Sequence, residues 1–112
     1  MRITRGDIWL TDFTGSVGRE QGGIRPAVVM SGAAVNSVPL GLLFAAPLTT
    51  TRRDWPYHVE VSASGTGLDK PSWAMMEQLG SISVRRLQRR IGHVDDALLD
   101  RMNVVFNRLL RP

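Results

Sequence analysis

The chain has 112 residues, enough for one domain with its own core but too few for a dinucleotide-binding fold with a second domain or for a TIM barrel. Hydrophobic residues make up 43% and charged residues 21%, which is typical of a globular protein and excludes a disordered chain. The net charge is +4, and all basic residues except Lys70 are arginine, which favours a nucleic acid or an acidic protein as partner, although codon usage explains the arginine bias equally well.

Residue types that several kinds of site require are missing from this sequence. The chain has no cysteine, which excludes disulfides, thiolate zinc sites and a cysteine nucleophile. Its two histidines, His58 and His93, fall in predicted strands, and we expect structural or surface roles for both. No P-loop, HExxH or GxSxG motif occurs. We therefore expect neither a metal site nor a cofactor.

The sequence shows no signal for secretion or for membrane insertion. Arg2, Arg5 and Asp7 place charge where a signal peptide needs an apolar core. The longest largely apolar stretch, 38–48, contains Pro39 and is far shorter than the roughly 20 residues of a membrane-spanning helix. We expect a soluble, cytoplasmic protein.

The first half of the chain predicts three strands. Alternating aromatic and β-branched residues indicate a strand over 7–13, and the glycine-rich segment 14–24 follows as a long loop. An apolar run that starts at a proline predicts a strand over 26–31. A connection with a helical turn at 33–36 leads to a third strand over 41–48.

The second half predicts shorter elements and one helix. In order they are a polar loop over 49–56, a strand over 57–61, a turn-rich segment over 62–71, a strand over 72–76 that can extend through Gln78, a short helix over 84–89 and a strand over 90–93. The tail is the clearest helix, because Asp95 and Asp96 suit its first turn and Leu98, Met102, Val105 and Leu109 form an apolar stripe. The fold class is therefore α+β and mainly β, a small barrel-like sheet of five or six strands with a C-terminal helix covering part of it.

Three polar segments stand at strand ends or in loops, where function concentrates. Arg25 ends the glycine-rich loop and could direct its guanidinium at a phosphate; an ordinary surface arginine is the alternative. Thr49 follows an apolar strand and could donate to a phosphoryl oxygen, or it simply suits a strand end. Glu77 follows an apolar stretch and could act as a base, or it is a solvated surface carboxylate.

The combination and order of these segments resemble the MazF/PemK/Kid family of toxin endoribonucleases. The matching pieces are RGDIW at 5–9, GREQGGIRPAVV at 18–29, PLT at 47–49, EQ at 77–78 and RIGHVD at 90–95 before a helix. The resemblance runs over nearly the whole chain, and the EQ-G-x-RP-V-V block is its most specific part.

The resemblance implies an SH3-like twisted β-barrel, usually a homodimer, that cuts single-stranded RNA, often messenger RNA, at short sequence motifs without a metal ion. It also implies a cognate antitoxin with an acidic or amphipathic C-terminal segment. The implied chemistry is attack of the ribose 2′-OH on the adjacent phosphorus, which leaves a 2′,3′-cyclic phosphate and a 5′-OH and spares DNA.

By position, Arg25 matches the family's catalytic arginine and Thr49 its catalytic threonine. Arg25 suits stabilisation of phosphate charge better than general-base catalysis, because a guanidinium stays protonated. The first choice for a carboxylate base is Glu77 and the second is Glu20 in the active-site loop. The residues expected to bind RNA are Ser16, Arg19, Gln21, Thr50, Arg52, Arg53, Trp55, Tyr57 and Gln78.

Among these, Arg52 and Arg53 are expected to contact phosphates, and Trp55 and Tyr57 to stack on bases. Ser16, Gln21 and Gln78 suit base edges. We expect Trp9 and Phe13 in the core, and Trp73 either in the core or in the RNA groove.

The chain departs from the family at two positions, where Met75 and Gly80 replace arginines that some members carry. These losses put the Kid-like mechanism in doubt and leave open a catalytically silent module that binds RNA or a partner. A gyrase poison of the CcdB type is a further alternative, but such proteins depend on a C-terminal Trp-Gly-Ile, and this chain ends in Leu-Leu-Arg-Pro.

Overall fold

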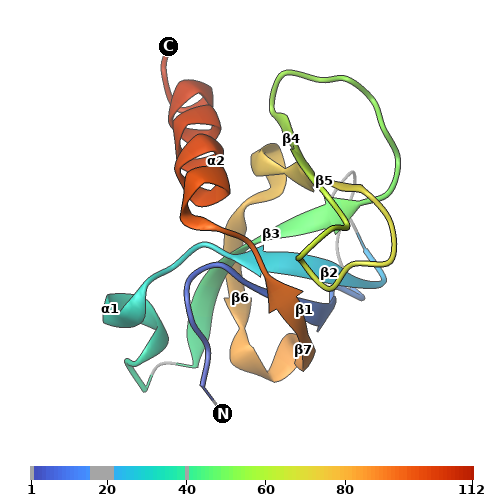
Figure 1. The fold of residues 1–112 in the computed structure, drawn as a ribbon. Helices are drawn as coiled ribbons and strands as arrows, with labels where there is room; N and C mark the ends of the chain where they lie inside the picture. The colour runs from blue at the N-terminus through green and yellow to red at the C-terminus, as the bar shows by residue number, and fades with distance from the viewer. Residues whose placement is uncertain (1, 16–21, 40) are drawn as a thin grey trace.

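The computed structural model describes residues 2–15, 22–39 and 41–112 (Figure 1). Its elements are β1 (Asp7–Asp12), β2 (Ile24–Val29), α1 (Ala33–Asn36), β3 (Leu42–Thr49), β4 (His58–Val61), β5 (Ser72–Met75), η1 (Met76–Gln78), β6 (Gly80–Ser83), η2 (Val84–Arg86), β7 (Leu87–His93) and α2 (Asp96–Leu109), where η denotes a 3-10 helix. The predicted fold class, a mainly β chain with a C-terminal helix, is confirmed.

The strands form one antiparallel sheet in the order β4-β5-β3-β2-β1-β7. β6 pairs with the first half of β3, over Leu42–Ala45, while β5 pairs with its end at Leu48 and Thr49. The 3-10 turn η1 connects β5 to β6 and therefore lies between these two pairings. In the described pairing β4 and β7 remain at the two ends of the order, so the sheet is barrel-like but open.

The loop between β4 and β5 reaches across to β7 and brings the two ends of the sheet together. At Gly92 an added Cβ would lie 1.7 Å from the carbonyl oxygen of Thr66. At Gly67 it would lie 2.3 Å from the carbonyl oxygen of Ile91. Only glycine permits so close an approach of two backbones.

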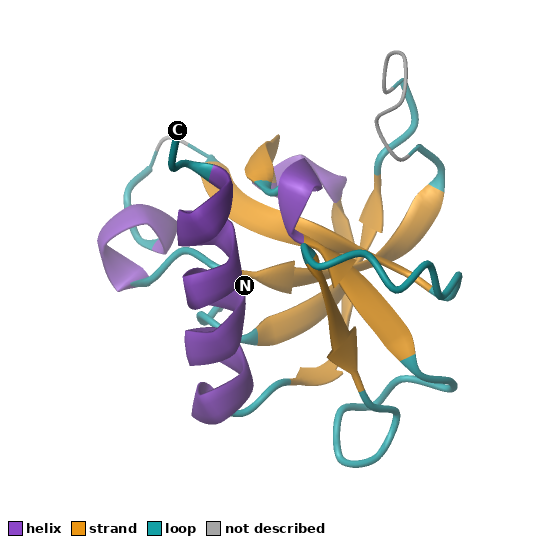
Figure 2. Cartoon of the chain, turned by 90° about the horizontal axis from the view of Figure 1, so that it is seen from above, coloured by secondary structure: helices purple, strands orange, loops and turns teal. Residues whose placement is uncertain are grey.

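Side-chain alternation along the central strands divides the core into two clusters. Ile8, Val28 and Leu48 belong to the first cluster, which α2 covers with Leu99, Met102 and Val105 (Figure 2). Trp9, Ala27, Val29, Leu43 and Ala45 point to the other face and form the second cluster with Phe13 and Leu87. Trp9 and Phe13 are buried, which confirms the prediction for both.

The Asp95 side chain caps α2 by accepting a hydrogen bond from the Leu98 amide at 2.9 Å, as the sequence predicted. The prediction of an apolar stripe along this helix was wrong at its last position, because Leu109 is 39% exposed. Leu109 is the last residue of α2. No helix among the described residues is long and apolar enough to cross a membrane.

Between residues 72 and 93 the strands predicted at 72 and at 90 are confirmed, but the segments next to them differ from the prediction. The strand at 72 ends at Met75 and gives way to η1 instead of running on through Gln78. The helix predicted over 84–89 is only the 3-10 turn η2, and β7 already starts at Leu87 because this segment pairs with β1. β6 was not predicted, so the sheet that the described residues form has seven strands and not five or six.

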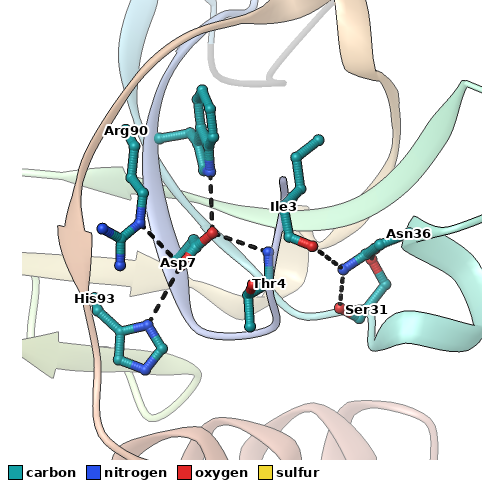
Figure 3. Close-up of polar contacts among 8 residues, drawn as sticks. Ile3, Thr4, Asp7, Ser31, Asn36, Arg90 and His93 are labelled. Atoms are coloured by element: carbon teal, nitrogen blue, oxygen red, sulfur yellow. Dashed lines mark hydrogen bonds and ion pairs between the residues drawn. The ribbon is translucent and has the colours of Figure 1, made fainter. Parts of the chain in front are cut away.

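A buried aspartate ties β1 to β7 (Figure 3). Asp7 Oδ2 accepts hydrogen bonds from the Thr4 amide at 2.9 Å and from Trp9 Nε1 at 3.4 Å. Asp7 Oδ1 lies 3.1 Å from Arg90 Nε and 3.4 Å from His93 Nδ1. The RGDIW motif thus supplies a structural carboxylate.

Candidate active site

The start of β2 brings Arg25 beside the end of β3. Arg25 Nη1 donates to the Leu48 carbonyl oxygen at 3.2 Å, and Arg25 Nε donates to the Gly22 carbonyl oxygen at 3.2 Å. These two backbone bonds hold the half-buried guanidinium next to Thr49, the residue after Leu48. The sequence positions 25 and 49 are therefore neighbours in space.

Both residues project from the face of the sheet opposite α2. Arg25 continues the alternation of Ala27 and Val29, and Thr49 continues that of Leu43 and Ala45, all of which belong to the second cluster. Thr49 is paired with Trp73 of β5, and its Oγ1 accepts a hydrogen bond from the Thr51 amide at 3.2 Å. Thr49 itself is buried, at 7% exposure.

Positive charge gathers around this pair. The pKa of Arg25 is held below its ordinary value by burial of the guanidinium and by the nearby charge of Arg53. An arginine remains protonated even so. An anion bound between the two arginines would offset both the cost of burying the Arg25 charge and the repulsion between Arg25 and Arg53. This makes the site suited to phosphate.

Three rings gather where the loop that arcs between β3 and β4 meets the start of β4 (Figure 1). The Arg53 guanidinium carbon is 5.3 Å from the centroid of the Trp55 ring. The Trp55 ring lies 5.6 Å from that of Tyr57 and 5.0 Å from that of His58. Trp55 is 44% exposed, so its surface is open to stacking by a planar ligand.

Glu77 lies in η1, where the chain turns between β5 and β6. Its Oε2 is 3.1 Å from Nε2 of His58, which sits opposite Met75 in the β4–β5 pairing. The side chain of Glu77 is 30% exposed and that of His58 is 1% exposed. His58 is thus buried in the site and is not a surface residue.

Sequence reasoning missed His58, because the register of β4 on β5 joins residues 19 positions apart. The HVEV alternation predicted a strand, but no sequence pattern predicted its partner.

A cavity of about 280 Å³ lies at the β4 edge of the site. Its lining consists of Arg52, Asp54, Trp55, Pro56, His58, Glu60, Trp73 and Arg101. Trp73 is half-buried and lines this cavity, so it belongs partly to the packed sheet and partly to the open site. Arg52 is exposed and forms an ion pair with Asp54 at 2.7 Å.

The remaining predicted site residues divide into two groups. Thr50 is exposed directly after Thr49, and Gln78 is half-buried at the end of η1. Ser16, Arg19, Glu20 and Gln21 lie outside the described residues. The described part of the chain brings together no group of three or more His, Asp or Glu side chains that could hold a metal ion.

Comparison with known proteins places this arrangement in a family. Residues 4–110 match the model of the PemK-like, MazF-like toxin of type II toxin–antitoxin systems. The chain is 33% identical over 104 residues to Endoribonuclease EndoA of Bacillus subtilis (strain 168), covering 92% of this chain and 90% of that protein.

Solved structures agree with the sequence comparison. The crystal structure of MazF (Form-I) from Deinococcus radiodurans has a TM-score of 0.82 and 30% identity, covering 96% of this chain and 94% of that one. The MazE–MazF structure (Form-II) from the same organism has a TM-score of 0.74 and 30% identity, covering 96% and 93%. The chain therefore belongs to the family of PemK-like, MazF-like toxins of type II toxin–antitoxin systems.

Proposed function

We propose that this protein is the toxin of a type II toxin–antitoxin system and acts as a metal-independent, sequence-specific endoribonuclease on single-stranded RNA, with messenger RNA as the expected target. The relative from Bacillus subtilis is named an endoribonuclease, which supports RNA cleavage. The single observation that carries the proposal is the hydrogen bond from Arg25 to the Leu48 carbonyl oxygen, because it sets a desolvated cation beside the Thr49 hydroxyl.

In the proposed reaction the ribose 2′ oxygen forms a bond to the adjacent phosphorus and the bond from phosphorus to the 5′ oxygen breaks. Glu77 takes the proton of the 2′-OH, and water returns a proton to the 5′ oxygen, so the products are a 2′,3′-cyclic phosphate and a 5′-OH. Arg25 and Thr49 bind the phosphoryl oxygens, whose negative charge grows in the transition state. Glu20 is the second candidate for the base.

The loop after Thr49 would bind the strand on either side of the cut. Arg53 and Arg52 would contact phosphates, while Trp55 and Tyr57 would stack on bases. Gln78, together with Ser16, Arg19, Gln21 and Thr50, completes the set that we propose for contacts with RNA. DNA would escape cleavage because it lacks the attacking 2′-OH.

The same positive site offers a surface for the antitoxin. A MazE–MazF complex is among the similar solved structures, and we propose a cognate antitoxin whose acidic or amphipathic C-terminal segment covers Arg25 and Arg53. A homodimer in the cytoplasm completes the proposal.

Cleavage of a mixed-sequence single-stranded RNA in excess EDTA tests the function. We expect the wild type to cut RNA at a short motif, to leave cyclic-phosphate ends and to spare DNA of the same sequence. Arg25→Ala should lower the cleavage rate at least ~100-fold, as loss of one oxyanion donor does in other enzymes. Its melting temperature should stay near that of the wild type, because Arg25 is only half-buried.

Asp100→Asn, an exposed change on α2, is the matched control and should cleave like the wild type. A folded wild type that cuts no RNA in a broad panel would overturn the proposal. It would favour a silent binding module or a gyrase poison instead.

A further inference from the structure

We propose that His58 is a positioning residue for the reaction, which holds the carboxylate of Glu77 in place as the general base. This inference rests on the proposed endoribonuclease function and on the role of Glu77 in it. The observation is the contact of 3.1 Å between His58 Nε2 and Glu77 Oε2.

The exposure of the two side chains decides which of them meets the substrate. His58 lines the cavity but its side chain is only 1% exposed, whereas the side chain of Glu77 is 30% exposed and is accessible to RNA. The contact occupies Oε2 of Glu77, and its other oxygen has no hydrogen-bond partner among the described residues. One carboxylate oxygen is therefore held by the protein, on a side chain that solvent reaches, as a positioned base requires.

The second ring nitrogen of His58 argues against a purely structural role. Nδ1 is buried and has no hydrogen-bond partner within the described part of the chain. Bonding of Nε2–H to a carboxylate assigns the proton to Nε2 and leaves a lone pair on Nδ1. A buried polar atom without a partner costs stability, and an apolar residue at this position would avoid that cost. The benefit that offsets it is the N–H that His58 provides for Glu77.

The surroundings of His58 keep its ring in one orientation. The ring of Tyr57 meets it edge-on at a centroid distance of 5.3 Å, and that of Trp55 lies tilted at 5.0 Å. Pairing of His58 with Met75 brings the ring toward η1, directly after β5. Trp55 also contacts Arg53, whose charge reaches Arg25, so a chain of neighbouring side chains links Glu77 to the phosphate-binding arginine.

Three substitutions at position 58 distinguish the contribution of the hydrogen-bond donor from that of the volume of the imidazole ring. His58→Gln keeps an N–H donor near the position of Nε2. His58→Asn keeps a donor, but on a side chain that is too short to reach Glu77. His58→Leu keeps the side-chain volume and removes the donor. The measurements are the single-turnover cleavage rate of an RNA that the wild type cuts and the Kd for the same RNA with a 2′-O-methyl group at the cut site. Thermal unfolding of each variant reports on folding.

We expect His58→Leu and His58→Asn to cleave about 10- to 100-fold more slowly, the usual loss when a supporting hydrogen bond of an active site is removed. Their Kd for the blocked RNA should not change, and His58→Gln should recover most of the rate. Glu77→Gln should lose about 100-fold or more. The double variant His58→Leu/Glu77→Gln should be no slower than Glu77→Gln alone, because His58 acts through Glu77.

Wild-type rates in folded His58→Leu and His58→Asn would overturn this inference while leaving the nuclease intact. Equal loss in His58→Gln, or losses that add in the double variant, would also overturn it. A wild-type chain that cuts no RNA would instead overturn the proposed function, so the two failures are distinguishable.

Discussion

At the scale of single residues, the two carboxylates with histidine neighbours differ in burial and hence in function. Asp7 is 3% exposed, and both of its oxygens accept hydrogen bonds. Glu77 keeps one oxygen without a partner among the described residues and is open to solvent. The same chemical pairing therefore supports the fold at Asp7 and, as we propose, the reaction at Glu77.

The Asp7 network predicts a pH dependence of stability. Burial raises the pKa of Asp7, but hydrogen bonds from Thr4, Arg90, Trp9 and His93 together outweigh it and bring the pKa below its ordinary value. The stabilisation is therefore complete above about pH 4 and is lost as the pH falls toward the lower pKa of the folded state. Asp7→Asn should lower the free energy of unfolding at pH 7 by about 2 kcal/mol.

Urea unfolding between pH 2 and 7 tests this prediction. The wild type should lose stability below pH 4 more steeply than Asp7→Asn. Parallel curves for the two proteins would contradict the assigned role of Asp7. Asp100→Asn, an exposed change on α2, is the control at the acid end.

At the scale of elements, close contact between the β4–β5 loop and β7 replaces strand pairing at the ends of the sheet. Gly92→Ala would place a methyl group against the Thr66 carbonyl, with no flexible side chain to move aside. We expect a loss of about 1–3 kcal/mol in the free energy of unfolding, the typical cost of overpacking. Gly32→Ala, which meets nothing within 4 Å, should change it by less than about 1 kcal/mol. If both changes lowered the free energy of unfolding equally in urea, the close contact between the loop and β7 would be contradicted.

The elements also show where prediction from sequence ends. Alternation predicted β1 and β4, and the Asp95 cap and apolar spacing predicted α2, because those signals depend on neighbouring residues. β6 has only the four residues GSIS, which carry no alternation of their own, and it forms because β3 offers an edge for pairing. η1 and η2 follow from the need to join short strands within that frame.

At the scale of the whole molecule, the net charge of +4 predicts salt-dependent binding of RNA. Arg53 should neutralise one phosphate, so Arg53→Ala should reduce the slope of log K against log salt by about 0.7 in magnitude. Fluorescence anisotropy with the 2′-O-methyl RNA between 50 and 300 mM salt, about the range in which such slopes are measured, gives this slope. Arg108→Ala, an exposed arginine in the last turn of α2, should leave it unchanged. An unchanged slope for Arg53→Ala would place Arg53 outside the RNA path.

The sequence by itself determined the fold class, the cap of α2, the core positions of Trp9 and Phe13, and the motifs that mark the family. These depend on local spacing and residue type, which are readable along the chain. Only the tertiary structure decided that Arg25 bonds the Leu48 carbonyl and that His58 bonds Glu77. Both contacts join residues about 20 positions apart, and strand register, which is set by the packing of the whole sheet, alone brings them within hydrogen-bond distance.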